Sequence, residues 1–182
     1  MGGYELNKQN KNIVYLISGP LGVGKSTTTK ELARNVEQCV LIEGDVLLNM
    51  LNDELLLSWE ERLRLTWENI VALTRNSLKH DLNVVIDFVV EEELEWFCEH
   101  LSDLKNVSLK YVVLKADKEK IIERLKIRGD IDSLERSLFL LNKMVSSPSI
   151  NKFSYDTTLK QPSETVKEVI KSTRFYVTIE AY

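Results

Sequence analysis

The chain has 182 residues, of which 43% are hydrophobic and 29% are charged, as is typical of a single globular domain. The formal net charge of −4 argues against sequence-independent binding of nucleic acid, which depends on a basic surface. No apolar run approaches the roughly 20 residues that a membrane-spanning helix needs. We therefore expect a cytoplasmic protein, monomeric or homodimeric, with one domain over residues 1–182, a flexible segment at 1–11, and neither nucleic acid nor membrane as a partner.

Apolar runs of strand length alternate along the chain with helical patterns. The strand-like runs are residues 13–17, 40–42, 84–88, 109–114 and a short segment near 153–155. The helical patterns cover residues 25–37, 46–80 with a break near 52–53, 91–101, 117–128, 133–145 and 163–172, the last capped by Ser163. Because the apolar runs show no polar alternation, they are typical of strands that helices cover on both faces. We predict an α/β fold with a parallel five-stranded sheet.

The stretch GPLGVGKS, residues 19–26, fits the phosphate-binding pattern G-x-x-x-x-G-K-[ST] and lies between an expected strand and an expected helix. Its glycines let successive N–H groups point at one anion, and the helix N-terminus adds partial positive charge. Lys25 is expected to reach the β- and γ-phosphates of ATP, and the Ser26 hydroxyl to coordinate Mg²⁺. The predicted nucleotide contacts are Gly19, Pro20, Leu21, Gly22, Val23, Gly24, Lys25, Ser26 and Thr27.

Acidic residues follow two of the expected strands, where ligands of open α/β sheets bind. Asp87 ends the apolar run VVID and is a candidate to hold Mg²⁺ or its water. Asp45, in the segment EGD after the second strand, is a candidate base for a hydroxyl proton during phosphate transfer. The alternative interpretation of both aspartates is a helix or turn cap.

Two arginines four residues apart, Arg124 and Arg128, lie on one face of an expected helix. They are candidates to neutralise a transferred phosphate or to stack on adenine. The alternative is a solvated face in which they pair with nearby acids such as Glu123 or Asp130.

Several motifs occur in the order found in P-loop small-molecule kinases: GPLGVGKS, EGD, VVID, VLKADKEKIIERLKIRG and a late YDTT at residues 155–158. The chain resembles the group of gluconate kinase, shikimate kinase and chloramphenicol phosphotransferase, and especially bacterial proteins labelled as gluconate kinases. The resemblance implies a P-loop NTPase fold with a short lid near residues 126–134. It also implies ATP and Mg²⁺ at Lys25 and Ser26, Asp45 near the acceptor hydroxyl, Arg124 and Arg128 beside the lid, and YDTT near the adenine.

The segment DFVVEEELEW, residues 87–96, departs from the gluconate kinases, which tend to carry serine and lysine there. An acidic segment is a poor place for an anionic sugar acid. Trp59, Arg62, Arg64 and Trp67 are candidates to line an acceptor pocket. The alternative is a core face at helical spacing, formed by Leu63, Trp67, Ile70, Val71 and Thr74.

The sequence thus predicts an ATP-dependent kinase that transfers the γ-phosphoryl group to a hydroxyl of a small molecule such as a sugar acid or an antibiotic. The catalytic candidates are Lys25, Asp45, Arg124 and Arg128, and the metal candidates are Ser26 and Asp87. The alternative is a regulatory protein that binds nucleotide without phosphotransfer, for which a base at Asp45 has no use.

Overall fold

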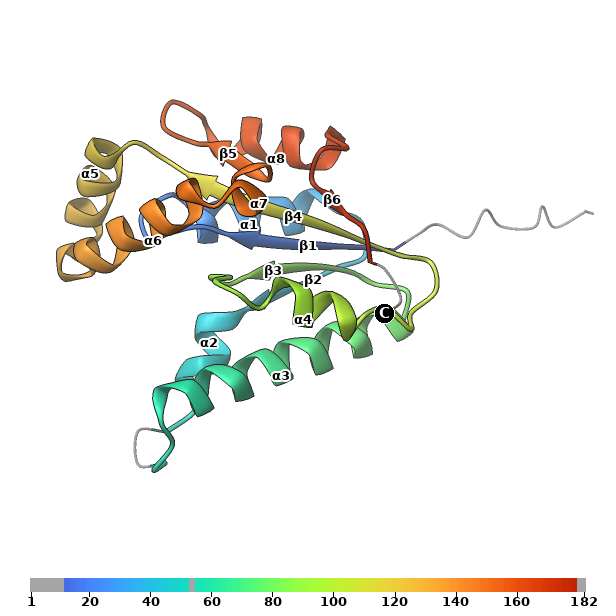
Figure 1. Cartoon of the computed structure of the whole chain (residues 1–182). Coiled ribbons are helices and arrows are strands. Elements are labelled where there is room, and N and C mark those ends of the chain that lie inside the picture. Colours follow the sequence, from blue (N-terminus) through green and yellow to red (C-terminus); the bar gives the residue numbers. More distant parts are fainter. Residues whose placement is uncertain (1–11, 53–54, 180–182) are drawn as a thin grey trace, which may run out of the picture.

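The computed structural model describes residues 12–52 and 55–179 and shows a sheet covered by helices on both faces (Figure 1). The sheet contains strands β1 (Asn12–Ser18), β2 (Cys39–Glu43), β3 (Asn83–Asp87), β4 (Val107–Lys115), β5 (Ser154–Asp156) and β6 (Tyr176–Val177). Five of them are parallel, as predicted, and they lie in the order β2-β3-β1-β4-β5. The segment 1–11, expected to be flexible, and part of the expected break near 52–53 lie outside the described residues.

The predicted strand number was wrong by one, because β6 is a sixth strand that pairs antiparallel with β4. β5 pairs with the end of β4, from Val113 to Lys115, and leaves the edge of the first half free. β6 pairs there, with Leu109 opposite Val177. A strand of two residues is too short to produce a periodic pattern, so β6 could not be predicted from the sequence.

The helices follow the predicted order, but several begin or end at other residues than predicted, and the short helix at residues 148–151 was not predicted. They are α1 (Lys25–Asn35), α2 (Gly44–Asn49), α3 (Trp59–Lys79), α4 (Leu94–Glu99), α5 (Lys118–Arg128), the 3₁₀ turn η1 (Ile131–Ser133), α6 (Leu134–Ser146), α7 (Pro148–Asn151) and α8 (Pro162–Lys171). The cap predicted at Ser163 was wrong: Gln161 caps α8, because Pro162 is well suited to the first turn of a helix. Within the described ranges, no helix is long and apolar enough to span a membrane.

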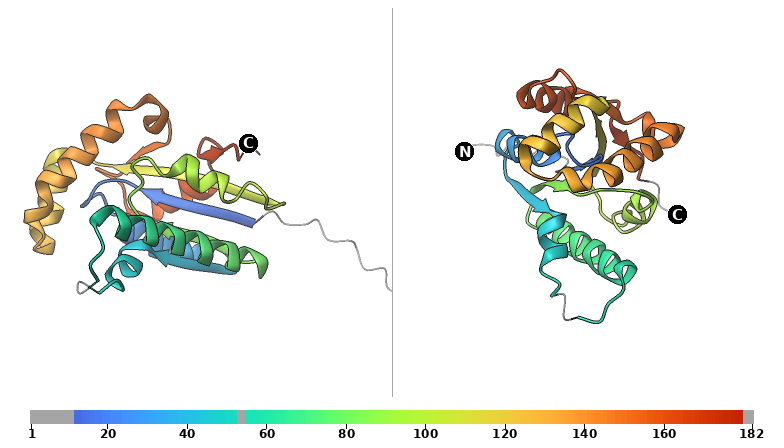
Figure 2. Two further views of the ribbon diagram at one scale, coloured as in Figure 1. Left: turned by 60° about the horizontal axis from the view of Figure 1, so that its bottom comes forward. Right: turned by 90° about the vertical axis from the view of Figure 1, so that its left-hand side faces the viewer.

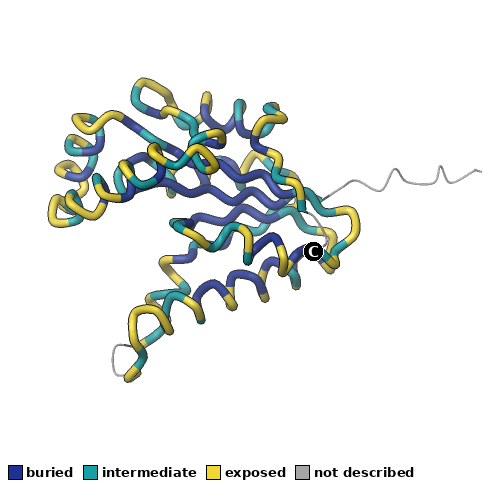
Figure 3. The backbone as a smooth tube through the Cα atoms, viewed as in Figure 1, coloured by how far each residue is buried: buried dark blue, intermediate teal, exposed yellow. Residues whose placement is uncertain are grey.

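Side chains of the central strand β1 alternate between two hydrophobic layers, since successive strand residues point to opposite faces. Val14 and Leu16 face one layer, which includes residues of α3, α4 and α6. Tyr15 and Ile17 face the other, which includes residues of α1, α5 and α8. Figure 3 shows the central strands as the most continuously buried part of the chain.

Helix α3 packs along β2 and β3, and its first turns, together with α2, lie apart from α5 and α6 (Figure 2). The loop between β1 and α1, the direct junction of β2 with α2, and the loop after β3 all lie at the carboxyl edge of the parallel sheet. This edge therefore gathers the candidate residues from separate parts of the sequence.

Candidate active site

The phosphate-loop motif forms the predicted turn between β1 and α1. Gly19 and Gly24 adopt φ angles of +137° and +97°, backbone conformations that residues other than glycine rarely adopt. At Gly19 a Cβ atom would also lie 2.3 Å from the Leu114 carbonyl oxygen, whereas at Gly24 the nearest such atom is 4.0 Å away. The motif glycine Gly19 therefore also allows the loop to pass close to β4.

The Lys25 ammonium folds back over the loop, where it donates hydrogen bonds to the carbonyl oxygens of Gly19 at 2.9 Å and Pro20 at 3.1 Å. Burial lowers the pKa of Lys25, while the carboxylates of Asp87 and Asp45 act in the opposite direction. The structure thus brings these two acids close enough to Lys25 to influence its charge.

Asp87 ends β3 with its Cα paired to those of Ile17 and Glu43 in the neighbouring strands, and only 6% of the residue is exposed. The Thr29 hydroxyl of α1 donates to Asp87 Oδ2 at 3.2 Å. Burial raises the pKa of the Asp87 carboxyl, and the Lys25 ammonium and the Ser26 hydroxyl oppose that rise. Ser26 and Asp87, the two predicted metal ligands, therefore lie side by side.

A hydroxyl and a carboxylate suit Mg²⁺, which usually completes its coordination with water and substrate phosphates. Among the described residues, no group of three or more His, Cys, Asp or Glu side chains could hold a metal ion. Ser26 and Asp87 together offer the oxygen ligands that Mg²⁺ takes from a protein alongside water and phosphates.

Asp45 is exposed in the first turn of α2, where it joins the same group of charges. Its neighbour Gly44 is buried against Phe88: a Cβ atom on Gly44 would lie 2.4 Å from that ring. This close approach fixes the start of α2 beside the end of β3. The cap position belongs to Glu43, which pairs with Lys30 at 2.9 Å, so Asp45 is not the N-cap residue of α2.

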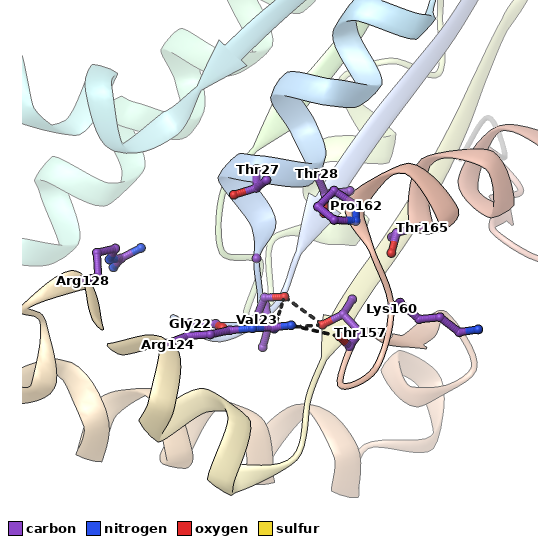
Figure 4. A pocket seen from close by; sticks show the side chains of 11 residues that line it. Gly22, Val23, Thr27, Thr28, Arg124, Arg128, Thr157, Lys160, Pro162 and Thr165 are labelled. Carbon is purple, nitrogen blue, oxygen red and sulfur yellow. Dashed lines mark hydrogen bonds between the residues drawn. The ribbon is translucent and has the colours of Figure 1, made fainter. Parts of the chain in front are cut away.

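A cavity of about 270 Å³ lies beside the phosphate loop, between α1, α5 and the segment from Thr157 to Thr165 (Figure 4). Gly22, Val23 and Gly24 form one wall, and Arg124 and Arg128 contribute from α5. The two predicted arginines and the late segment after β5 therefore meet at one cavity.

Arg124 reaches the loop directly: its guanidinium donates to the Val23 oxygen at 3.1 Å and to the Thr157 oxygen at 3.0 Å. The Thr157 hydroxyl, which is buried, also donates to the Val23 oxygen at 2.8 Å. These bonds tie the phosphate loop to the segment after β5. Arg128 forms an ion pair with Asp130, as the alternative of a solvated face paired with nearby acids predicted.

The other side of the phosphate loop is held by residues that the sequence motifs did not single out. The backbone N–H of Val90 donates to the Ser18 hydroxyl at 2.9 Å, and the Ser137 hydroxyl of α6 donates to the Leu21 oxygen at 2.7 Å. Ser18 directly precedes Gly19, which is the only signal that could have marked it.

The interpretation of Trp67 as a pocket residue was wrong. Trp67 is 2% exposed and packs edge-on against Phe88 and Phe97, as the alternative of a core face predicted. Trp59 is 58% exposed at the start of α3. Arg62 donates to the Leu51 oxygen at 2.9 Å and thereby joins α3 to the end of the α2 segment.

Residues 16–142 match the family model described as AAA domain. The chain belongs to this family. This AAA domain protein is similar to the tunicamycin resistance protein of Deinococcus radiodurans, at 17% identity and a TM-score of 0.65, over 87% of this chain and 93% of that one. A gluconokinase from Sinorhizobium meliloti 1021 is 17% identical, with a TM-score of 0.59 and coverage of 89% and 91%.

A sugar kinase from Janibacter sp. HTCC2649 is 14% identical, with a TM-score of 0.63 over 94% of this chain and 99% of that one. No curated protein sequence matches this AAA domain protein significantly. The structural likeness confirms the predicted P-loop NTPase fold and the resemblance to P-loop small-molecule kinases at the level of fold.

Proposed function

We propose that the protein is an ATP-dependent kinase that transfers the γ-phosphoryl group to a hydroxyl of a small molecule. The observation that carries this proposal is the pair of carboxylates, Asp87 and Asp45, beside Lys25 of the phosphate loop. Asp87 alone would suffice to support a metal–nucleotide complex. The exposed Asp45 adds a group that can accept a proton.

Nucleotide binding would use the loop between β1 and α1. Its N–H groups and the start of α1 would bind the phosphates, and Lys25 would exchange the Gly19 and Pro20 oxygens for phosphate oxygens. Ser26 and Asp87 would hold Mg²⁺, which neutralises charge on the phosphates when bound. The cavity beside Arg124 and Thr157 would take the nucleoside. The remaining contacts would come from Leu21, Gly22, Val23, Gly24 and Thr27.

In the transfer step, the oxygen of the acceptor hydroxyl would form a bond to the γ-phosphorus while Asp45 accepts the proton of that hydroxyl. The bond between that phosphorus and the β–γ bridging oxygen would break, with ADP as the leaving group. Arg124 and Arg128, next to the predicted lid at 126–134, would offset the charge that develops. Holding the reactants in line would supply much of the rate.

The alternative is a regulatory protein that binds nucleotide without transferring phosphate. The similarity in fold to a gluconokinase and a sugar kinase supports the kinase, although at these identities it concerns the fold alone. The two hypotheses differ in what Asp45 does, because only a kinase needs a base at this position.

The test is ADP release with Mg²⁺ and ATP across a panel of sugar acids, polyols, nucleosides, phenicols and aminoglycosides. Lys25→Ala serves as the blank. Asp45→Asn should abolish the stimulated turnover and preserve ATP affinity, whereas Glu43→Gln, two residues away and paired with Lys30, should retain the turnover. If no acceptor stimulates ADP release while ATP binds tightly, the regulatory protein becomes the better account.

A further inference from the structure

The loop after β3 and the start of α6 form a wall beside the phosphate loop. Val90 is hydrogen-bonded to Ser18, and Ser137 is hydrogen-bonded to Leu21. Their neighbours in the chain, Glu91 and Arg136, therefore also lie at this wall. Val90 belongs to the hydrophobic layer of α3, α4 and α6. The cavity beside Arg124 belongs to the opposite side, where α5 and α8 pack.

This placement separates the two substrates that the proposed function requires. A nucleoside in the cavity leaves the opposite side of the loop for the acceptor. The start of α2, with Asp45, borders that side because Gly44 packs on Phe88, the first residue of the loop after β3. We refer to Glu91, Glu92, Arg136 and Lys143 as the acceptor-side charges.

Within the acceptor-side charges, Glu91 holds both basic residues of α6. Its carboxylate pairs with Arg136 through one oxygen and with Lys143 through the other, at 3.1 Å. Glu92 makes a second pair with Lys143 at 3.0 Å. The Glu93 carboxylate accepts hydrogen bonds from the N–H groups of Glu91 at 2.8 Å and Glu92 at 3.0 Å, which fixes the turn.

The side chain of Glu91 is 23% exposed, so its pairs with Arg136 and Lys143 are partly shielded from water. A carboxylate or phosphate group on an acceptor would have to displace Glu91 to reach either cation. Glu91 would then lose its partners beside a second acid, Glu92. Leaving a partly buried charge unpaired is costly, and like charges repel.

We propose that Glu91 determines the charge class of the acceptor: by occupying Arg136 and Lys143, it excludes acceptors with an anionic group near the reacting hydroxyl and selects neutral ones. This inference rests on the proposed function. It identifies a neutral polyhydroxyl compound, rather than a sugar acid, as the class of substrate that fits the wall.

The experiment measures the binding of two probes, D-gluconate and D-glucitol. They differ at one end only, where gluconate carries a carboxylate and glucitol a neutral hydroxymethyl group. Calorimetric titrations with Mg²⁺ and ADP present compare the wild type with Glu91→Gln. The control is Glu92→Gln, which removes an acid of the same cluster but leaves Glu91 between the two cations.

Glu91→Gln should bind gluconate at least about tenfold more tightly than the wild type and than Glu92→Gln. Adding Arg136→Gln to Glu91→Gln should remove that gain. If the gain came only from a loosening of the fold by Glu91→Gln, the second substitution would not remove it. Preferential binding of gluconate by the wild type, or no gain in Glu91→Gln relative to Glu92→Gln, would overturn the proposal. Because the experiment measures binding, it tests the role of Glu91 even if no phosphotransfer is found. Absence of phosphotransfer would contradict the proposed function and not the role of Glu91.

Discussion

Alanine substitutions at two glycines of the phosphate loop should destabilise the protein to different extents. Both positions have positive φ, which costs an L-residue about 1–2 kcal/mol. At Gly24 the nearest atom to a new Cβ is 4.0 Å away, so Gly24→Ala should cost only this strain. At Gly19 the new Cβ would lie 2.3 Å from the Leu114 oxygen, and Leu114 is buried in β4, between β1 and β5.

The collision at Gly19 involves backbone, so a rotamer change cannot relieve it. Overpacking of this kind typically adds about 1–3 kcal/mol, so Gly19→Ala should cost about 2–5 kcal/mol in total. The assay is equilibrium unfolding in urea, followed by circular dichroism and by the fluorescence of the buried Trp67. Equal losses of unfolding free energy in the two variants would refute the contact between Gly19 and β4.

Two further predictions concern residues that contact the phosphate loop. Asp87→Asn should raise the free energy of unfolding more at pH 7 than at pH 4. Burial raises the pKa of the Asp87 carboxyl above its ordinary value of 3.8, so the folded protein holds the carboxyl proton more tightly than the unfolded chain does. The wild type therefore loses stability as the pH rises from 3.8 through the pKa of the folded state, whereas asparagine has no proton to lose. Urea titrations at both pH values measure the difference, and a difference independent of pH would contradict the assignment. Thr157→Val should weaken the binding of Mg²⁺-ATP about fivefold, since one hydrogen bond to the Val23 oxygen is lost, while Thr157→Ser should bind like the wild type. Calorimetry measures both affinities, and equal affinity in the valine variant would show that Thr157 does not position the loop.

The sequence by itself determined the parts of this protein that depend on neighbours in the chain. A phosphate loop needs glycines, a lysine and a hydroxyl within eight residues, and GPLGVGKS supplies them locally. Apolar runs marked four of the five parallel strands, because burial of a strand leaves a pattern within the run. The fifth, β5, is half-buried to exposed and matches only the short segment expected near 153–155. The position of Asp87 at the end of β3, and of Asp45 two residues after the end of β2, followed from the same runs.

Only the tertiary structure decided the contacts between distant segments. The bond from Thr157 to Val23 joins residues 134 positions apart, and the pair of Glu91 and Arg136 joins residues 45 apart. Lys110 is another example: the residue is 2% exposed, and its ammonium donates to the Val169 and Ile170 oxygens at the end of α8.

Such contacts leave no mark in the local sequence, because a lysine, a glutamate or a threonine has the same local pattern whether it is solvated or paired. What decides its partner is the strand order and the helix packing, which bring the segments together. Local chemistry therefore predicted what the phosphate loop is, and packing decided which residues hold it on either side.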